Sequence, residues 1–109
     1  MSVPLVSVVV PCFNEEEVLR DTNHRLVTTL QKLPFQFEVV YVDDGSSDAT
    51  PEILRELQAG DPRVKVVRFS RNFGHQMAIT AGIEHAAGDA VAVIDGDLQD
   101  PPEVILEFV

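Results

Sequence analysis

The chain has 109 residues, of which 45% are hydrophobic, so we expect one small domain with a packed core. Its net charge of -10 argues against nucleic acid or an anionic membrane surface as a partner, and a phosphate-bearing ligand would need a bridging cation. Cys12 is the only cysteine, which excludes an internal disulfide and is typical of a small buried residue. No apolar run approaches the roughly 18 residues of a membrane span and no signal peptide opens the sequence, so we expect a cytoplasmic protein.

The first strand and helix follow from the apolar pattern at the start of the chain. The β-branched run 5–10 predicts a strand that Pro11 ends. Asn14 stands where a helix N-cap is expected, and the three glutamates after it suit the first turn, where the helix dipole favours acids. The spacing of the following leucines predicts a helix over 15–32.

The middle of the chain predicts two further strands around a second helix. Residues 37–42 form a second β-branched run. Thr50 and Pro51 fit the N-cap and the first residue of a helix that Gly60 ends. Residues 64–69 predict the third strand.

The last part of the chain continues the same alternation. A helix rich in small residues is predicted to begin after Gly74 and to end at Gly88. Residues 90–94 predict the fourth strand, and a further helix is expected over 103–109.

This pattern indicates an α/β fold. Strands that are near-continuous runs of Val and Ile, alternating with helices, indicate a parallel sheet covered on both faces. Right-handed crossovers then give a doubly wound, mostly parallel, Rossmann-like sheet of the form β-α-β-α-β-α-β, followed by a C-terminal helix. We treat residues 1–109 as a single domain. Ligands of such sheets bind beyond the carboxyl ends of the strands, near the point where the strand order reverses.

Acidic residues follow two of the four predicted strands. Asp43 and Asp44 follow the second, and Asp95 and Asp97 follow the fourth. On a strand, residues i and i+2 project to the same side, and Gly96 between the last pair leaves room for a ligand to approach. Taken alone, each segment reads as a solvated acidic turn. Together at one sheet edge, they predict a site for Mg²⁺ or Mn²⁺.

The third helix offers a second feature at the predicted edge. Its start near Gly74 has no acid beside it in sequence, whereas Arg68 and Arg71 precede it. The free amides of this helix start are therefore a candidate anion site. Each arginine considered singly is typical of an ordinary solvated charge.

Four segments together resemble the family 2 glycosyltransferases of the GT-A fold. These segments are VPCFNE at 10–15, VDDGSSD at 42–48, RNFGHQ at 71–76 and DGDLQDPPE at 95–103. The combination is most similar to the polyprenyl-phosphate branch, which includes dolichol-phosphate mannose synthase and the bactoprenol glucosyltransferases. The resemblance covers the whole chain and identifies it as the N-terminal, donor-binding half of a longer catalytic domain.

The resemblance implies a role for each matching residue. Asp95 and Asp97 would hold Mg²⁺ or Mn²⁺ with Gln99 beside them, and Asp97 is the residue to which we assign catalysis. Asp44 would accept a hydrogen bond from the base, and Asp43 would support its loop. The remaining donor-binding residues implied by the resemblance are Pro11, Phe13, Asn14, Glu15, Gly45, Arg71, Gln76 and Gly96. Phe13 departs from the family pattern, which often has Tyr there.

The same resemblance implies the reaction and the partners. The donor would be a UDP- or GDP-sugar and the acceptor a polyprenyl phosphate, with inversion at the anomeric carbon. The cations that bind the acceptor phosphate lie further along the family's chain, so we expect these 109 residues alone to be inactive. A full-length relative would act at the cytoplasmic face of a membrane.

Three other classes of function stay open at this point. A receiver-type signalling domain also has an acidic, Mg²⁺-binding sheet edge, but it carries its acidic pair after the first strand. A phosphatase of the haloacid-dehalogenase type also places its Asp-x-Asp after the first strand, whereas Asp95 follows the fourth here. A nucleotide-binding module without catalysis is the third alternative.

The C-terminal segment predicts self-association. Five of the six residues in 104–109 are apolar, and a sheet that stops after its fourth strand has an unpaired edge. We therefore expect a homo-oligomer that buries this segment.

Overall fold

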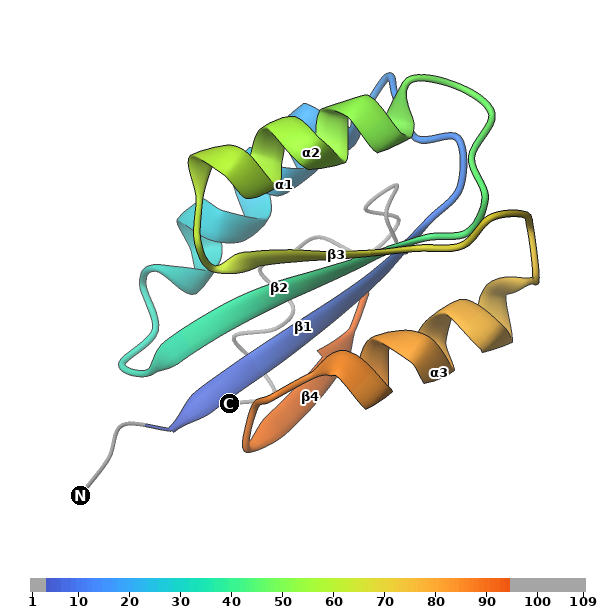
Figure 1. The fold of residues 1–109 in the computed structure, drawn as a ribbon. Coiled ribbons are helices and arrows are strands. Elements are labelled where there is room, and N and C mark those ends of the chain that lie inside the picture. The colour runs from blue at the N-terminus through green and yellow to red at the C-terminus, as the bar shows by residue number, and fades with distance from the viewer. Residues whose placement is uncertain (1–3, 95–109) are drawn as a thin grey trace.

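The computed structural model describes residues 4–94, which form a four-stranded sheet with helices on both faces (Figure 1). The elements in chain order are β1 (Leu5–Cys12), α1 (Leu19–Leu30), β2 (Gln36–Asp43), α2 (Thr50–Gly60), β3 (Val64–Arg68), α3 (His75–His85) and β4 (Ala90–Val93). The helix expected over 103–109 lies outside the described residues.

The sheet has the order β3-β2-β1-β4, and all of its strand pairs are parallel. The chain builds outward from β1 to β2 and β3, and then returns to place β4 on the other side of β1. The strand order therefore reverses between β1 and β4. This arrangement confirms the predicted doubly wound α/β sheet.

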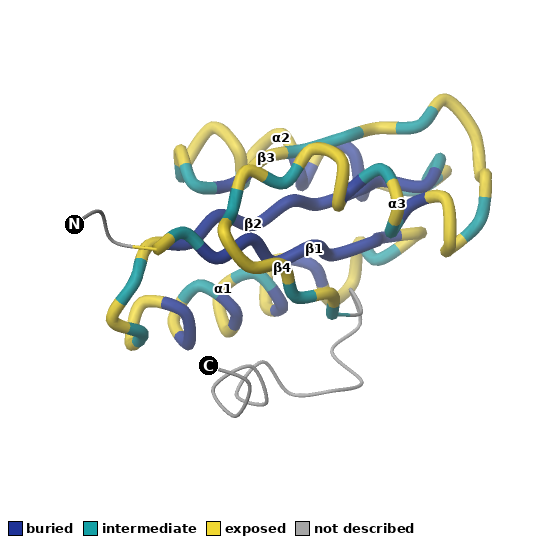
Figure 2. The backbone as a smooth tube through the Cα atoms, turned by 90° about the horizontal axis from the view of Figure 1, so that it is seen from below, coloured by how far each residue is buried: buried dark blue, intermediate teal, exposed yellow. Residues whose placement is uncertain are grey.

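Alternate residues of the central strands pack into two separate cores. Val8 and Val10 of β1 face α1 and α2, whereas Val9 packs with Ala78 of α3. Figure 2 shows that β1 and β2 are buried along most of their length, while β4 is mostly exposed. Because both faces are covered, the inner strands are apolar on both sides, which explains their unbroken Val runs.

The largest difference from the predicted elements lies at the start of α1. The helix begins at Leu19, Val18 is its N-cap residue, and no side chain caps it. Asn14 lies before the helix with a left-handed φ of 52°, and its side chain accepts a hydrogen bond from the Ser47 amide instead. Asn is favoured at both helix N-caps and left-handed turns, so the sequence alone did not distinguish them.

Other boundaries differ by one to three residues. Ala49, not Thr50, is the N-cap residue of α2, and α3 ends at His85 rather than at Gly88. β1 continues through Pro11 to Cys12. Pro11 is tolerated at this position for two reasons. The Cys12 carbonyl, in the next residue, accepts the neighbouring hydrogen bond from the Asp44 amide after β2, and the described pairing of β1 with β4 ends at Val9.

A buried polar cluster lies between the sheet and the loop after α3. Glu38 of β2 is only 5% exposed. One of its carboxylate oxygens accepts hydrogen bonds from Ser7 Oγ (2.5 Å) and the Ala87 amide (2.6 Å), and the other lies 2.6 Å from Lys65 Nζ. Burial favours the neutral acid, but these bonds outweigh it and lower the pKa of Glu38 below its ordinary value.

This cluster predicts that stability depends on pH through Glu38. A carboxyl group whose pKa is lowered by folding stabilises the protein above its ordinary pKa of about 4.3, and that stabilisation is lost as the pH falls through the folded pKa. The melting temperature of Glu38→Gln should therefore fall less steeply than that of the wild type between about pH 6 and about pH 3. This pH range includes the ordinary pKa of a glutamate and extends below it, where the folded protein loses the charge on Glu38. Parallel curves for the two proteins would contradict this role.

Close packing of α3 on the sheet gives a second prediction. A Cβ at Gly82 would run into Cγ1 of Val9, whereas a Cβ at Gly60, at the end of α2, would meet nothing. Gly82→Ala should lower the free energy of unfolding by about 1–3 kcal/mol. Gly60→Ala is the matched control and should leave stability unchanged or raise it by up to about 1 kcal/mol. Denaturant unfolding measures both; equal effects of the two changes would count against this packing.

Candidate functional site

Three loops meet at the carboxyl edge of the sheet, on the right-hand side of Figure 1. They comprise residues 13–18 after β1, 44–49 after β2 and 69–74 after β3. Parallel pairing brings these loops together because all of the strands end at the same edge. The contacts between the loops show how the predicted site residues are held.

Asn14 joins the loop after β1 to the loop after β2. Its backbone amide donates to Ser46 Oγ (2.9 Å), and its side-chain oxygen accepts from the Ser47 amide (2.8 Å). The left-handed backbone at Asn14 turns the residue toward this second loop. Asn14 therefore has a structural role within the segment predicted to bind the donor: it holds the loops after β1 and β2 together.

The glutamates after Asn14 extend the same connection. The Glu15 amide donates to Thr50 Oγ1 (2.9 Å), and the Glu16 carboxylate accepts from the Ala49 amide (2.9 Å). Asp48 completes the connection by accepting from the amides of Glu16 (3.2 Å) and Thr50 (2.9 Å). The glutamates lie before the helix, so their expected place in its first turn was wrong.

Asp44 holds the loop after β3. Its carboxylate accepts hydrogen bonds from the amides of Phe73 (2.7 Å) and Gly74 (3.1 Å) and from Asn72 Nδ2 (3.3 Å). Gly74 is the N-cap residue of α3, so Asp44 lies at the start of that helix. The first turn of α3 contains no acid, as the sequence indicated, but Asp44 reaches this helix start from a distant part of the chain and binds the amides that were a candidate anion site.

Asp43 is buried beside Asp44, but its hydrogen bond stays within the loop after β2. Its Oδ1 accepts from the Ser46 amide (3.0 Å). Its Oδ2 has no hydrogen-bond donor among the described residues, and the nearest cation, Arg68, has Nε 3.9 Å away. Asp43 thus supports the loop after β2, as the sequence predicted for it, and carries a buried carboxylate oxygen without a hydrogen-bond donor.

Gly45 is required where the loops after β2 and β3 cross. Its φ is +72°, and a Cβ there would run into the backbone of Arg71 and Asn72. Only glycine accommodates both the left-handed backbone and this close approach. The close approach brings Arg71 directly beside the Asp-Asp-Gly segment.

Aromatic side chains are exposed at the same edge. Phe13 is 44% exposed and Phe73 is 43% exposed. The Arg71 guanidinium lies over the Phe73 ring, 4.7 Å from its centroid. Gln76 is also exposed, in the first turn of α3, whereas Pro11 is buried and offers no open surface. Flat aromatic faces and a cation at one edge suit a planar, anionic ligand.

The predicted metal ligands Asp95, Asp97 and Gln99, with Gly96 between them, lie outside the described residues. The described chain ends at Ile94, whose amide donates to the Val9 carbonyl (3.0 Å). The chain thus enters this acidic segment beside β1, at the place where the strand order reverses. Within residues 4–94, no three His, Cys, Asp or Glu side chains are grouped so that they could hold a metal ion.

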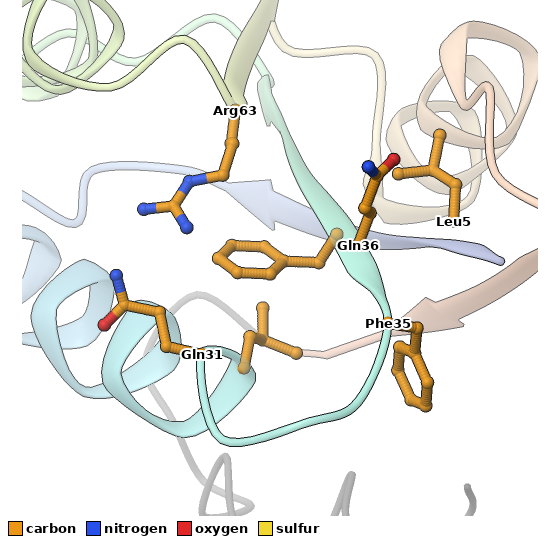
Figure 3. A pocket seen from close by; sticks show the side chains of 7 residues that line it. Leu5, Gln31, Phe35, Gln36 and Arg63 are labelled. Carbon is orange, nitrogen blue, oxygen red and sulfur yellow. The ribbon is translucent and has the colours of Figure 1, made fainter. Parts of the chain in front are cut away.

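Two further features have no assigned part in this chemistry. A hollow of about 450 Å³ is lined by Phe35, Phe37 and Arg63, but it lies at the amino ends of β1 and β2 (Figure 3).

Cys12 is buried, as predicted. Burial raises the pKa of its thiol, and the nearby carboxylates of Glu15 and Asp43 raise it further. The thiol therefore stays protonated and is not a nucleophile. No helix of residues 4–94 has the length and apolar character needed to cross a membrane.

The bonds of Asp44 generate a prediction. Asp44→Ala leaves the part-buried amides of Phe73 and Gly74 without their acceptor, so the free energy of unfolding should fall by about 1–3 kcal/mol. Asp21→Ala, which removes an exposed acid from α1, is the matched control and should change stability little. Chemical denaturation of both variants tests this; an Asp44→Ala protein as stable as Asp21→Ala would refute the capping role.

Known proteins resemble this chain over most of its length. A bactoprenol glucosyl transferase of Shigella phage SfV is 50% identical over 105 residues, which are 95% of this chain and 34% of that protein. An undecaprenyl-phosphate 4-deoxy-4-formamido-L-arabinose transferase of Edwardsiella ictaluri is 44% identical over 109 residues, 99% of this chain and 34% of that protein. The chain therefore spans about a third of the length of these relatives.

Solved structures have the same fold. A mannosyltransferase from Pyrobaculum calidifontis in complex with GDP-Man and Mn²⁺ matches with a TM-score of 0.72 and 26% identity, over 89% of this chain and 28% of that one. TarS 1-349 of S. aureus in complex with UDP-GlcNAc matches with a TM-score of 0.73 and 28% identity, over 99% of this chain and 30% of that one. These matches confirm the GT-A-like fold.

The family assignment rests on a match to a family model that covers nearly the whole chain. The model of glycosyl transferase family 2 matches residues 7–109, which include all four segments that carried the resemblance. This match removes the receiver-type and phosphatase alternatives. The chain belongs to glycosyl transferase family 2.

Proposed function

We propose that this domain binds a UDP- or GDP-sugar at the carboxyl edge of its sheet, together with Mg²⁺ or Mn²⁺. The whole protein would then transfer the sugar, with inversion, to a polyprenyl phosphate. The observation that carries this proposal is the position of β4. It leads directly from the reversal point beside β1 into the Asp95-Gly96-Asp97 segment.

The loops at this edge suit the nucleoside part of the donor. We assign the base to the surface formed by Phe13, Phe73 and Arg71, because these side chains are exposed and can stack on a flat ring. Asp44 was expected to hydrogen-bond the base directly. Since the loop after β3 already occupies its oxygens, we propose that Asp44 acts on the base by holding Phe73 in place.

The donor set after β4 suits a divalent cation. Asp95 and Asp97 supply two hard carboxylate oxygens, and Gln99 supplies an amide oxygen, which are ligands that Mg²⁺ and Mn²⁺ prefer. When bound, the metal would neutralise charge on the departing nucleoside diphosphate. Support comes from the similar mannosyltransferase structure, which holds GDP-Man and Mn²⁺. Gly96 would leave room for the sugar.

The names of the relatives support the class of acceptor. One is a bactoprenol glucosyl transferase and the other acts with undecaprenyl phosphate. A phosphate acceptor is already anionic at neutral pH, so transfer to it needs little help from a general base. What it needs is cations that bind it, and we assign these to the part of the relatives that this chain does not span. The predicted homo-oligomer rests on residues 104–109, outside the described part, and stays a prediction.

The metal site provides the test of this proposal. Nucleotide binding should require Mg²⁺ or Mn²⁺, because both the site and the ligand are anionic. Asp97→Asn removes one ligand charge and should weaken binding at least about tenfold, or 1.4 kcal/mol. Asp21→Asn makes the same change of net charge on the surface of α1 and should bind like the wild type.

Titration calorimetry with UDP and with GDP, each in Mn²⁺ and in EDTA, measures these affinities and also identifies the base. Equal affinity in Mn²⁺ and in EDTA would rule out the metal-dependent site. Equal loss in the Asp97 and Asp21 variants would show that only the net charge matters.

A further inference from the structure

The strand that leads to the acidic segment is held weakly by its own side chains. β4 has four residues, Ala90–Val93, and it pairs within the described part only with β1. Val91 and Val93 are each 42% exposed. Little apolar surface is therefore buried to fix this strand in one place on the sheet.

The side-chain pattern of β4 does not define its register either. The sequence Ala-Val-Ala-Val repeats every two residues, so a slip of two residues puts the same residue types on the same faces. Each strand residue rises about 3.3 Å, so such a slip would move the following carboxylates by roughly 7 Å. Metal–oxygen bonds of about 2.0–2.6 Å do not tolerate that displacement. Another interaction must therefore set the register.

A polar clamp at the start of β4 supplies this interaction, beside the two bonds between Asp89 and Leu5: the Asp89 amide donates to the Leu5 carbonyl (2.7 Å), and the Leu5 amide donates to Asp89 Oδ2 (2.8 Å). We define the clamp as Ser7, Glu38 and the backbone amides of Ala87 and Gly88. The Ala87 amide donates to Glu38 Oε2 (2.6 Å), and the Gly88 amide donates to Ser7 Oγ (2.8 Å). The Ser7 hydroxyl in turn donates to the same Glu38 oxygen (2.5 Å). These bonds tie two successive amides before β4 to side chains of β1 and β2.

The clamp is specific to one register for two reasons. Ser7 is fully buried and Glu38 is 5% exposed, so removing an amide from this cluster would take one hydrogen-bond donor from an oxygen that water does not reach. Gly88 also lies very close to β1: a Cβ there would be 2.5 Å from Ser7 Oγ and 2.7 Å from the Ser7 amide nitrogen. A two-residue slip would bring Ala86 or Ala90 to this place, and neither fits.

We propose that this clamp fixes the register of β4 on β1, and that Glu38 is thereby a positioning residue for the metal-binding carboxylates Asp95 and Asp97. The assignment of the metal rests on the proposed function, whereas the register does not. The clamp acts at the amino end of β4, and the acidic segment follows its carboxyl end.

The two oxygens of Glu38 allow the clamp to be tested separately from the rest of the cluster. Oε2 serves the clamp, and Oε1 pairs with Lys65. Glu38→Met removes both acceptors, whereas Glu38→Gln keeps one oxygen for the clamp. Lys65→Met removes only the ion pair. Tyr41→Phe is the control for stability, because it removes a part-buried hydrogen bond (2.6 Å) that a side chain of the same strand donates to Asn23.

Amide hydrogen exchange reports the register directly. The Ile94 amide donates to the Val9 carbonyl of β1. The Val39 amide of β2 donates to the Arg63 carbonyl, just before β3, toward the opposite edge of the sheet. In Glu38→Met the Ile94 amide should exchange at least tenfold faster relative to Val39 than in the wild type. The ratio should stay near the wild-type value in Glu38→Gln, Lys65→Met and Tyr41→Phe. Mn²⁺ affinity, measured with UDP or GDP present, should fall at least fivefold in Glu38→Met alone.

An unchanged exchange ratio in Glu38→Met, or the same change in Tyr41→Phe, would overturn the proposal. If Glu38→Met does not fold, Gly88→Ala tests the clamp from the opposite side and should give the same pattern. Wild-type protein that binds neither nucleotide with Mn²⁺ would contradict the proposed function, and the exchange ratio would then decide the register by itself. An altered ratio with unaltered Mn²⁺ affinity would overturn the positioning role of Glu38.

Discussion

The pairing of β1 with β2 on one side and β4 on the other is the constraint on which the rest of the structure depends. Because both pairs are parallel, every described loop that carries a candidate functional residue leaves the sheet at one edge. The return of the chain to β4 creates the reversal of strand order at which ligands of such sheets bind. The two cores, one on each face, keep β1 and β2 rigid beneath these loops.

At this edge, residues to which we assign donor binding also hold the structure together. Asn14, Asp44 and Gly45 belong to segments typical of the family, and in this structure they hold neighbouring loops together. Their bonds run between loops rather than within one loop. A ligand that contacts several of these loops therefore meets a surface that is already ordered, which lowers the entropy cost of binding. Because one residue would serve both purposes, we expect substitutions at these positions to change stability and ligand binding together.

The two ends of β4 have different tasks. Its amino end is anchored by buried polar groups, Ser7 and Glu38, whose bonds are directional and break if the strand slips. Its carboxyl end leads to charged residues that need an exact position but cannot be buried without a partner. Directional bonds at one end can thus define geometry at the other, because a strand transmits its register along its length.

The sequence by itself determined the fold class, the order of the elements and the family. Apolar periodicity defines strands and helices locally, and the four motif segments are specific when they occur together. It also predicted that Cys12 is buried, which the structure confirms. These conclusions rest on residue types and their spacing along the chain.

Only the tertiary structure decided the partners of the polar groups. Asp44 caps a helix start about thirty residues away, and Asn14 turns toward another loop instead of capping α1. Glu38 is a single acid within an apolar strand, a pattern that can indicate a buried carboxylate with a polar partner. Its partners, however, come from three other segments of the chain. A hydrogen bond depends on distance and direction in space, and sequence separation contains neither.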